Sequence, residues 1–176
     1  MEHEVKKEEA SLGKALRFSA AQRQWACEVD KVREIVRSAT ITALPNSTYM
    51  VAGVINVRGE VVPVIDPWPQ GRSDSAPNSN KKTVIILQTH DEHIGLRVDH
   101  VYSIEDIQAF DLNSSMDSDT ASLHEMVSCN VYLADTDSVP LVDVGLILES
   151  VRSIGQKEAQ ETTGQDHALS VAGGIQ

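Results

Sequence analysis

The sequence predicts a mainly β protein made of two small barrels, each built from short strands. Short runs of Val, Ile and Leu are separated by turns that contain Gly and Pro, which is typical of small β-barrels. Aromatic residues make up only 4% of the 176 residues, so the core must consist mainly of aliphatic side chains. The chain also repeats one pattern of residues, so we expect two related units.

Four segments read as two hairpins. In the first half, Leu16–Ala20 and Trp25–Val29 flank a polar turn. In the second half, Val84–Thr89 and Ile94–Val98 flank another polar turn. Each pair is apolar and short, and each is joined by turn-forming residues, as in a β-hairpin.

A further strand and two short helices complete the expected elements. Val61–Ile65 is almost entirely β-branched and follows Gly59, which favours a strand after a turn. Short helices are expected at Ser47–Ala52 and at Val144–Val151, the second with Asp143 as its N-cap.

The repeat is visible in two places. Residues 29–35 and 98–104 both read Val-Asp-x-Val-x-x-Ile, at an offset of 69. Residues 62–66 and 139–143 both read Val-Pro, two aliphatic residues and Asp, at an offset of 77. The second half therefore carries about eight extra residues, which we place in the polar stretch 111–122.

The repeat and the composition give the expected domain boundaries. The charged start and the Gln-, Thr- and Gly-rich end read as flexible tails, and the stretch between the halves is rich in Pro, Ser and Asn. We expect an N-terminal tail (1–13), one domain (14–154) with halves 14–66 and 82–154 and connector 67–81, and a C-terminal tail (155–176).

The net charge and the lack of targeting patterns limit the partners and the location that we expect. The chain has 15 Lys and Arg against 26 Asp and Glu, a net charge of −11, which disfavours nucleic acid and anionic membranes. The first residues lack the apolar core of a secretory leader, and no apolar run approaches the ~20 residues of a membrane span. The two cysteines lack CxxC spacing. We expect a cytoplasmic protein without direct membrane insertion.

The sequence shows no motif of catalysis, metal binding or cofactor binding. Residues 90–93 read His-Asp-Glu-His, but they bracket a predicted hairpin turn, where a solvated charged tip is the better interpretation. Cys27 lies next to Glu28, which raises rather than lowers a thiol pKa, so a buried structural cysteine is favoured. We therefore expect no enzyme activity, no metal and no cofactor.

One apolar stretch, residues 51–59, has two interpretations. It is either a core strand whose Arg58 points into water, or a surface element. In the second case Gly53 marks a close backbone approach, and Arg58 is fixed by a carboxylate such as that of Glu34.

This stretch begins a recognisable signature. Residues 53–66, GVINVRGEVVPVID, resemble the CheW family signature G-x-x-N-L-R-G-x-x-x-P-V-x-D. Residues 31–36, 41–45 and 95–99 match the family in order and spacing, and the resemblance runs from about residue 14 to residue 151.

The resemblance implies a CheW-like fold of two SH3-like five-stranded barrels around a shared apolar seam. It also implies a non-catalytic adaptor that links methyl-accepting chemotaxis receptors to the histidine kinase CheA, in arrays that contain other CheW-like proteins. Such a protein is cytoplasmic and is recruited to membrane-associated receptors. An alternative is a CheW-like regulatory module that binds a small ligand or a localisation factor outside such an array.

Site residues follow from the same resemblance. The receptor is expected in the groove between the barrels, which would be lined by Val32, Glu34, Gly53, Val54, Arg58, Ile85, Val101 and Ile104. The kinase is expected to contact exposed positions around Asn56, Val57 and Glu60.

Several positions depart from the family pattern, including Asn130 where Gly is usual and the stretch 111–119. Val57 replaces the usual Leu, and Arg97 stands where an apolar residue is common, next to the expected groove. Trp68 lies in an unusual Pro-Trp-Pro stretch, where it is either an exposed anchor for a partner or a cap on the barrel.

Overall fold

The computed structural model describes residues 12–45, 50–68, 82–89, 92–111, 126–133 and 136–153. Its strands are β1 (Lys14–Ala20), β2 (Arg23–Glu28), β3 (Val32–Ala39), β4 (Val51–Val57), β5 (Glu60–Ile65), β6 (Lys82–Gln88), β7 (His93–Val98), β8 (His100–Asp111), β9 (Val127–Leu133) and β10 (Thr136–Val142). A 3-10 turn, η1 (Val29–Lys31), joins β2 to β3. Residues 144–153 form a helix.

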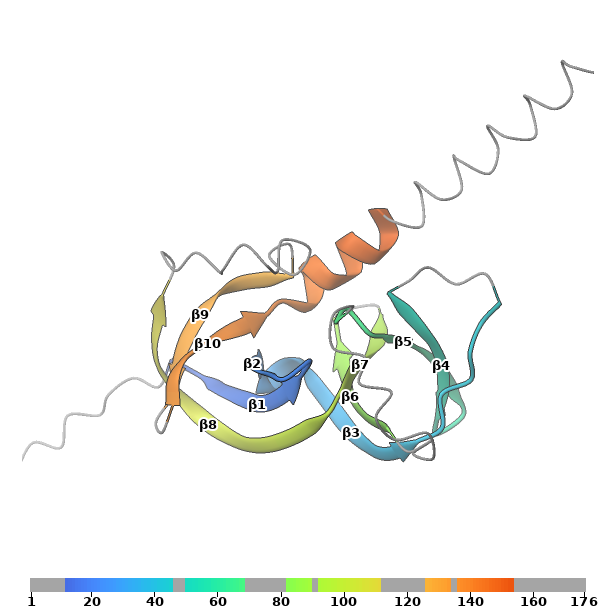
Figure 1. The fold of residues 1–176 in the computed structure, drawn as a ribbon, viewed down its shortest axis with the longest axis horizontal. Helices are drawn as coiled ribbons and strands as arrows, with labels where there is room; N and C mark the ends of the chain where they lie inside the picture. Colours follow the sequence, from blue (N-terminus) through green and yellow to red (C-terminus); the bar gives the residue numbers. More distant parts are fainter. Residues whose placement is uncertain are drawn as a thin grey trace, which may run out of the picture.

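The strands form two five-stranded sheets, seen side by side in Figure 1. The first subdomain is a closed barrel in the order β1-β2-β10-β9-β8. The second has the order β3-β6-β7-β5-β4, and an isolated bridge between Thr42 and Val54 joins β4 to the segment that follows β3. The expected fold class, mainly β with two five-stranded units, is confirmed.

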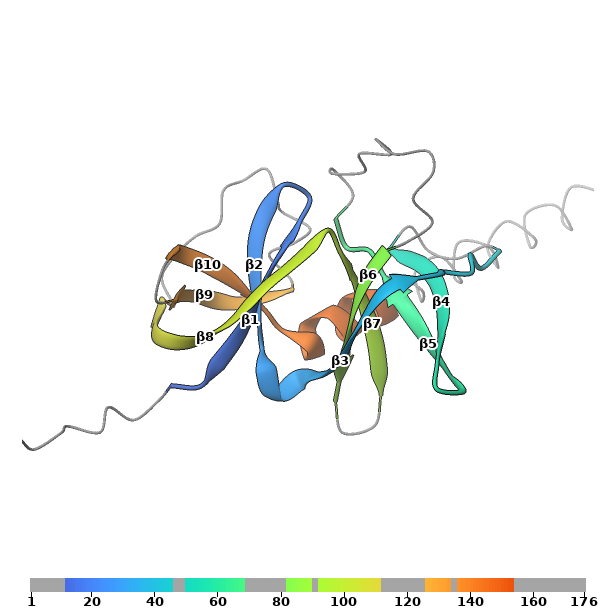
Figure 2. The same cartoon turned by 90° about the horizontal axis from the view of Figure 1, so that it is seen from below.

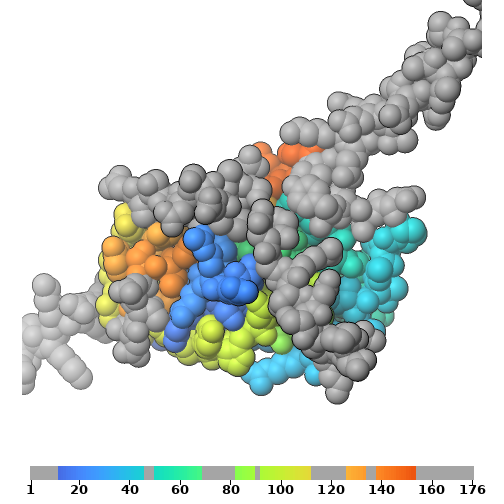
Figure 3. All heavy atoms as spheres, viewed as in Figure 1, coloured from blue at the N-terminus to red at the C-terminus, as the bar shows by residue number. Residues whose placement is uncertain are grey.

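The two halves of the chain are interleaved in these sheets. Each subdomain takes a hairpin from one half and three strands from the other, β1–β2 with β8–β10 and β6–β7 with β3–β5. The chain crosses between subdomains twice, from β2 to β3 and from β7 to β8 (Figure 2). The space-filling view accordingly shows the start of the chain (blue) against its later strands (orange) (Figure 3).

The register of the two sheets follows the offsets of the sequence repeat. The register within hairpin β1–β2 is the same as that within hairpin β6–β7 when 69 is added to each residue number. Each sheet also contains one parallel pairing. Ala26 pairs with Leu141 in the first subdomain, and Gly95 pairs with Val64 in the second, at offsets of 69 and 77. A residue in one subdomain therefore has a definite counterpart in the other.

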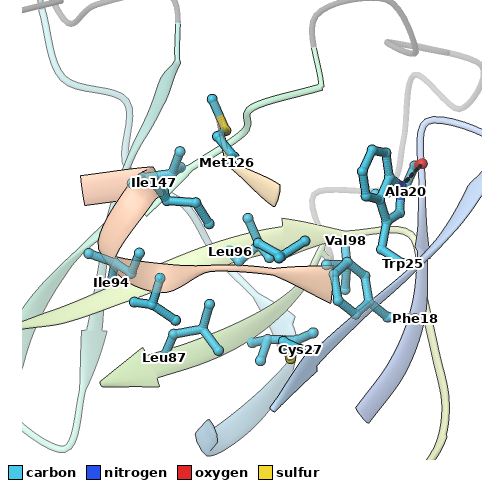
Figure 4. Packing of buried hydrophobic residues seen from close by; sticks show 14 of the residues in the cluster. Phe18, Ala20, Trp25, Cys27, Leu87, Ile94, Leu96, Val98, Met126 and Ile147 are labelled. Carbon is cyan, nitrogen blue, oxygen red and sulfur yellow. Dashed lines mark hydrogen bonds between the residues drawn. The ribbon is translucent and has the colours of Figure 1, made fainter. Parts of the chain in front are cut away.

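The largest apolar cluster lies between the two subdomains. We call it the seam core; it contains side chains of both, among them Phe18, Trp25, Leu87, Ile94 and Ile147 (Figure 4). Alternate residues of β1 and β6 face opposite ways, as a pleated strand requires. One set enters the seam core, and the other enters the smaller clusters inside each sheet.

Trp68 belongs to the seam core. Its side chain is buried, its ring centroid lies 4.4 Å from that of Trp25, and its indole Nε1–H donates to the Arg97 carbonyl at 3.0 Å. Of the two interpretations of Trp68, the buried cap holds and the exposed anchor is wrong.

Cys27 is a buried thiol within the same cluster. Burial, followed by the charge of Glu28, raises its pKa to about 12. The predicted structural role of this cysteine is confirmed.

The helix predicted at Val144–Val151 is present, and Asp143 caps it. The Asp143 Oδ1 accepts the backbone N–H groups of Gly145 at 2.7 Å and Leu146 at 3.1 Å. Among the described residues, no helix is long and apolar enough to cross a membrane.

Two local predictions were wrong. The helix expected at Ser47–Ala52 is absent from its described part, because Met50 is a turn residue and Val51 begins β4, whose β-branched residues pair with β5. The strand expected to reach Val29 ends at Glu28, where η1 turns the chain into β3. Several predicted segments lie outside the described residues. These are the N-terminal tail up to residue 11, the C-terminal tail from residue 154, residues 69–81 of the connector, residues 90 and 91, and the stretch 112–125.

Candidate partner-binding surface

Four aliphatic residues occupy the edge of the seam core, and we call them the seam edge: Val32 and Ile35 of β3, and Val101 and Ile104 of β8. Val32, Ile35 and Val101 are half-buried and pack against the seam core. Ile104 is 56% exposed and is paired with the buried Leu16.

The two strands contribute equivalent residues to this edge. Val32 pairs with Leu87 of β6 as Val101 pairs with Phe18 of β1, and Ile35 and Ile104 are related in the same way. The sequence prediction named three of the four and missed Ile35. The signal was present, since the repeated pattern aligns Ile35 with Ile104.

Charged groups lie at one end of the second subdomain, on the β3 residues between Val32 and Ile35 of the seam edge. The Arg58 Nη2 donates to the Glu34 Oε2 at 3.3 Å, and the Arg33 Nη1 donates to the Glu60 Oε2 at 2.8 Å. Successive residues of β3 are thus tied to the hairpin between β4 and β5. The predicted pair of Arg58 and Glu34 is present, with the Arg58 side chain 78% exposed and Glu34 largely covered.

His93, at the start of β7, adds a third group to this end of the sheet. Its Nδ1 is within hydrogen-bonding distance of the Glu60 Oε1. Hydrogen bonds from His93 and then Arg33 lower the pKa of Glu60, so this carboxylate remains charged.

The signature residues form the hairpin that presents Arg58. Arg58 and Gly59 both have positive φ, 53° and 91°, as the central residues of a type I′ turn require. The Asn56 Oδ1 accepts the Gly59 N–H at 2.9 Å and closes the turn. Asn56 is exposed, as expected for a partner-facing residue, but its amide also has this structural task.

Val57 and Ile85 are not on the surface. Val57 is 4% exposed and lies in the cluster inside the second subdomain, so the expectation of an exposed kinase-facing side chain was wrong. Ile85 is fully buried in the seam core, so it supports the seam edge from beneath and does not line it. Strand alternation, which the signature does not reveal, sends both side chains inward.

Gly53 is a point of close backbone approach, but the approaching segment belongs to the same chain. The backbone of Thr42 exchanges two hydrogen bonds with Val54, each of 2.8 Å. A Cβ at Gly53 would lie 2.2 Å from the Thr42 carbonyl oxygen. Gly53 is buried, so we correct its expected role from partner contact to leaving room for the Thr42 backbone. Val54 beside it is half-buried and remains accessible.

Arg97 is held within the protein. Its Nη1 donates to the Asp66 Oδ2 at 2.8 Å, and the Asp66 side chain is only 10% exposed. Asp66 is the last residue of the signature, so the departure at Arg97 is matched by a partner inside the fold. Within the described ranges, no group of three or more His, Cys, Asp and Glu side chains is placed to hold a metal ion.

Comparison with known proteins agrees with this architecture. The chain is 30% identical over 89 residues to a "Chemotaxis protein CheW" of Thermotoga maritima, covering 51% of this chain and 58% of that protein. It is 32% identical over 87 residues to a "Probable chemotaxis protein CheW" of Rhizobium etli, covering 49% and 56%. The matched region thus spans less than two thirds of these relatives.

Structure comparison and a family model extend over more of the chain. The fold resembles the crystal structure of the "scaffolding protein TtCheW" from Thermoanaerobacter tengcongensis, with a TM-score of 0.62, 23% identity, and coverage of 75% of this chain and 89% of that one. A family model described as the CheW-like domain matches residues 14–152. The chain therefore belongs to the CheW-like domain family.

Proposed function

We propose that this protein is a non-catalytic adaptor that couples methyl-accepting chemotaxis receptors to the histidine kinase CheA in a chemosensory array. Membership of the CheW-like family supports this role, and the relatives it matches are named as chemotaxis proteins. The protein would act in the cytoplasm, at membrane-associated receptors.

The observation that carries the proposal is the composition of the seam edge and its neighbouring ion pair. Exposed and half-exposed aliphatic residues of the seam edge come from both subdomains, and Glu34, which lies between Val32 and Ile35 in β3, holds the exposed guanidinium of Arg58. An amphipathic helix binds to such a surface by inserting apolar side chains and matching the charge at the border. We assign the receptor to this surface, with Val32, Val101 and Ile104 as apolar contacts and Arg58 as the charged one.

The kinase would bind at the hairpin between β4 and β5, on the residues that flank Arg58. Asn56 is exposed and Glu60 is half-exposed, and both lie near the turn between β4 and β5. We assign the kinase contact to the border formed by these two residues. Other CheW-like proteins could occupy equivalent barrel faces.

The test is a binding assay with a purified receptor cytoplasmic fragment. Arg58→Glu should weaken receptor binding at least tenfold, because it places a carboxylate beside Glu34. The backbone strain is unchanged, since both residues carry a Cβ at the same positive φ. The ion pair is exposed and is worth at most about 1 kcal/mol, so the circular dichroism spectrum should remain that of the wild type.

Two further variants make the result specific. The double variant Arg58→Glu with Glu34→Arg should recover part of the affinity by restoring the pair. Arg37→Glu changes the same charge on an exposed residue of β3 and should bind normally. Normal receptor binding by Arg58→Glu would overturn the assignment of the receptor to this surface.

A further inference from the structure

A second surface, separate from the seam edge, contains a pocket of about 420 Å³. It lies where the ends of β2, β6, β8 and β10 meet the start of the helix. The residues that matter below are Glu28, Phe110, Cys129, Asp143 and Gly145, all of which line it. None of the residues assigned to receptor or kinase binding lines this pocket.

The pocket contains acidic groups without a matching cation. Lys31 also lines it, but its ammonium lies 3.3 Å from the carboxylate of Asp30, another lining residue. No ion pair within the described part of the chain involves Glu28 or Asp143. Glu28 and Asp143 follow the parallel pair Ala26 and Leu141 by two residues each, and both line the pocket.

The repeat supplies a direct comparison for this arrangement. At offsets of 69 and 77, the counterparts of Glu28 and Asp143 are Arg97 and Asp66. In the second subdomain the aspartate binds a guanidinium at 2.8 Å. In the first subdomain the same position of the fold has a second carboxylate in place of that guanidinium.

The counterpart of Gly145 is Trp68, at the same offset of 77. The Trp68 ring is buried, and its N–H reaches the backbone of Arg97. Gly145 lines the pocket and has no side chain to correspond to the indole. Among the described residues, Glu28 and Gly145 thus stand where the second subdomain has the cation of Arg97 and the ring of Trp68.

We propose that this pocket receives an arginine side chain of a protein partner, whose guanidinium pairs with Glu28 and Asp143 as Arg97 pairs with Asp66. Phe110, which is 41% exposed, also lines the pocket, and an aromatic ring attracts a guanidinium. An aromatic residue next to the arginine would occupy the space above Gly145. The partner segment is therefore one that combines an arginine with a neighbouring aromatic residue.

The probe is the dipeptide acetyl-Trp-Arg amide, titrated into the full chain and followed by amide NMR. We expect saturable shifts at Glu28, Thr89 and Gly145. The same dipeptide with citrulline, which has the shape of arginine without its charge, should bind at least tenfold more weakly. Equal binding of the citrulline dipeptide would overturn the proposal, and so would shifts confined to other surfaces.

Glu28→Arg is the decisive variant because it installs the missing cation. It should pair with Asp143, keep the fold and abolish binding of the Trp-Arg probe. Asp106→Arg makes the same charge change at an exposed residue outside the pocket and should leave binding intact. Retained binding in Glu28→Arg would contradict the proposal.

Free arginine is the third arm of the test. If free arginine binds as tightly as the dipeptide, the pocket is a small-molecule site and the assignment to a protein partner is wrong. The receptor assay with Arg58→Glu is unaffected by any of these results, because the two surfaces share no residue.

Discussion

Gly53 lies against the backbone of Thr42, which exchanges two hydrogen bonds with the neighbouring Val54 and so bridges β4 to the segment after β3. A Cβ at Gly53 would lie 2.2 Å from the Thr42 oxygen, and the backbone there has a φ of +142°. The first glycine of the signature is therefore explained by the fold itself. A substitution of Gly53 therefore alters the fold itself, and does not act by removing a contact with a partner.

Gly53→Ala should destabilise the protein more than Gly59→Ala does. At Gly59 a Cβ meets no atom within 4 Å, so alanine causes only the strain of a positive φ, about 1–2 kcal/mol. At Gly53 the same strain adds to a backbone overlap. Urea unfolding measures both variants, and equal losses would contradict the account of the Thr42 contact.

Trp68→Ala should lower the free energy of unfolding by about 3–5 kcal/mol, because it empties a site in the seam core. Trp68→Phe keeps an aromatic ring against Trp25 and loses the hydrogen bond to Arg97, so it should be intermediate. The measurement is chemical unfolding followed by circular dichroism. A loss below about 0.5 kcal/mol for Trp68→Ala would indicate an exposed side chain instead.

The two cysteines should react at very different rates. Cys27 is buried with a pKa raised to about 12, so almost no reactive thiolate is present at pH 8, whereas Cys129 is partly exposed. A thiol reagent such as DTNB should label one cysteine in the native protein and both in guanidinium chloride. Fast native labelling of two thiols would show that the seam core is open.

The Trp-Arg dipeptide should slow the labelling of Cys129, because that thiol lines the proposed arginine pocket. The Cys129→Ser variant identifies the reactive residue and serves as the control. Unchanged labelling at saturating dipeptide would count against binding at this pocket.

Glu105 should make the stability of the fold depend on pH in the acidic range. A hydrogen bond from Ser103 (2.6 Å) and an ion pair with Arg17 (2.7 Å) lower the pKa of this largely buried carboxyl. A carboxyl with a lowered folded-state pKa contributes stability above its ordinary value of 4.5, and the contribution is lost as the pH falls below it.

The variant Glu105→Gln tests this pH dependence. It should be less stable than the wild type at pH 7 and should lose less further stability between pH 5 and pH 3. Thermal unfolding across this range measures the difference. Parallel pH profiles for the two proteins would show that Glu105 has no such role.

The sequence predicted the hairpins and the duplication well, because both depend on local patterns. The repeated Val-Asp-x-Val-x-x-Ile aligns Val32 with Val101, and the structure pairs both with equivalent strands. It could not predict the interleaving of the halves, since strand partners are chosen by long-range packing.

The site residues show the same division between local and long-range effects. The pairing of Arg58 with Glu34 was one of two interpretations of residues 51–59, and it is present. The burial of Val57 and Ile85 was missed, because inward and outward faces of a strand depend on which sheet covers it. Trp68 was ambiguous for a similar reason: only the position of Trp25, far earlier in the chain, makes it part of the core.

Co-sedimentation tests the central claim most directly. Vesicles carrying a receptor cytoplasmic fragment are mixed with CheA, with and without this protein, and the pelleted kinase is quantified. The account predicts that the kinase pellets with receptors when the wild-type protein is present, and that Arg58→Glu abolishes this gain while Arg37→Glu preserves it. If the wild-type protein leaves the pelleted kinase unchanged, or if Arg58→Glu works as well as the wild type, the adaptor role assigned to this surface is contradicted.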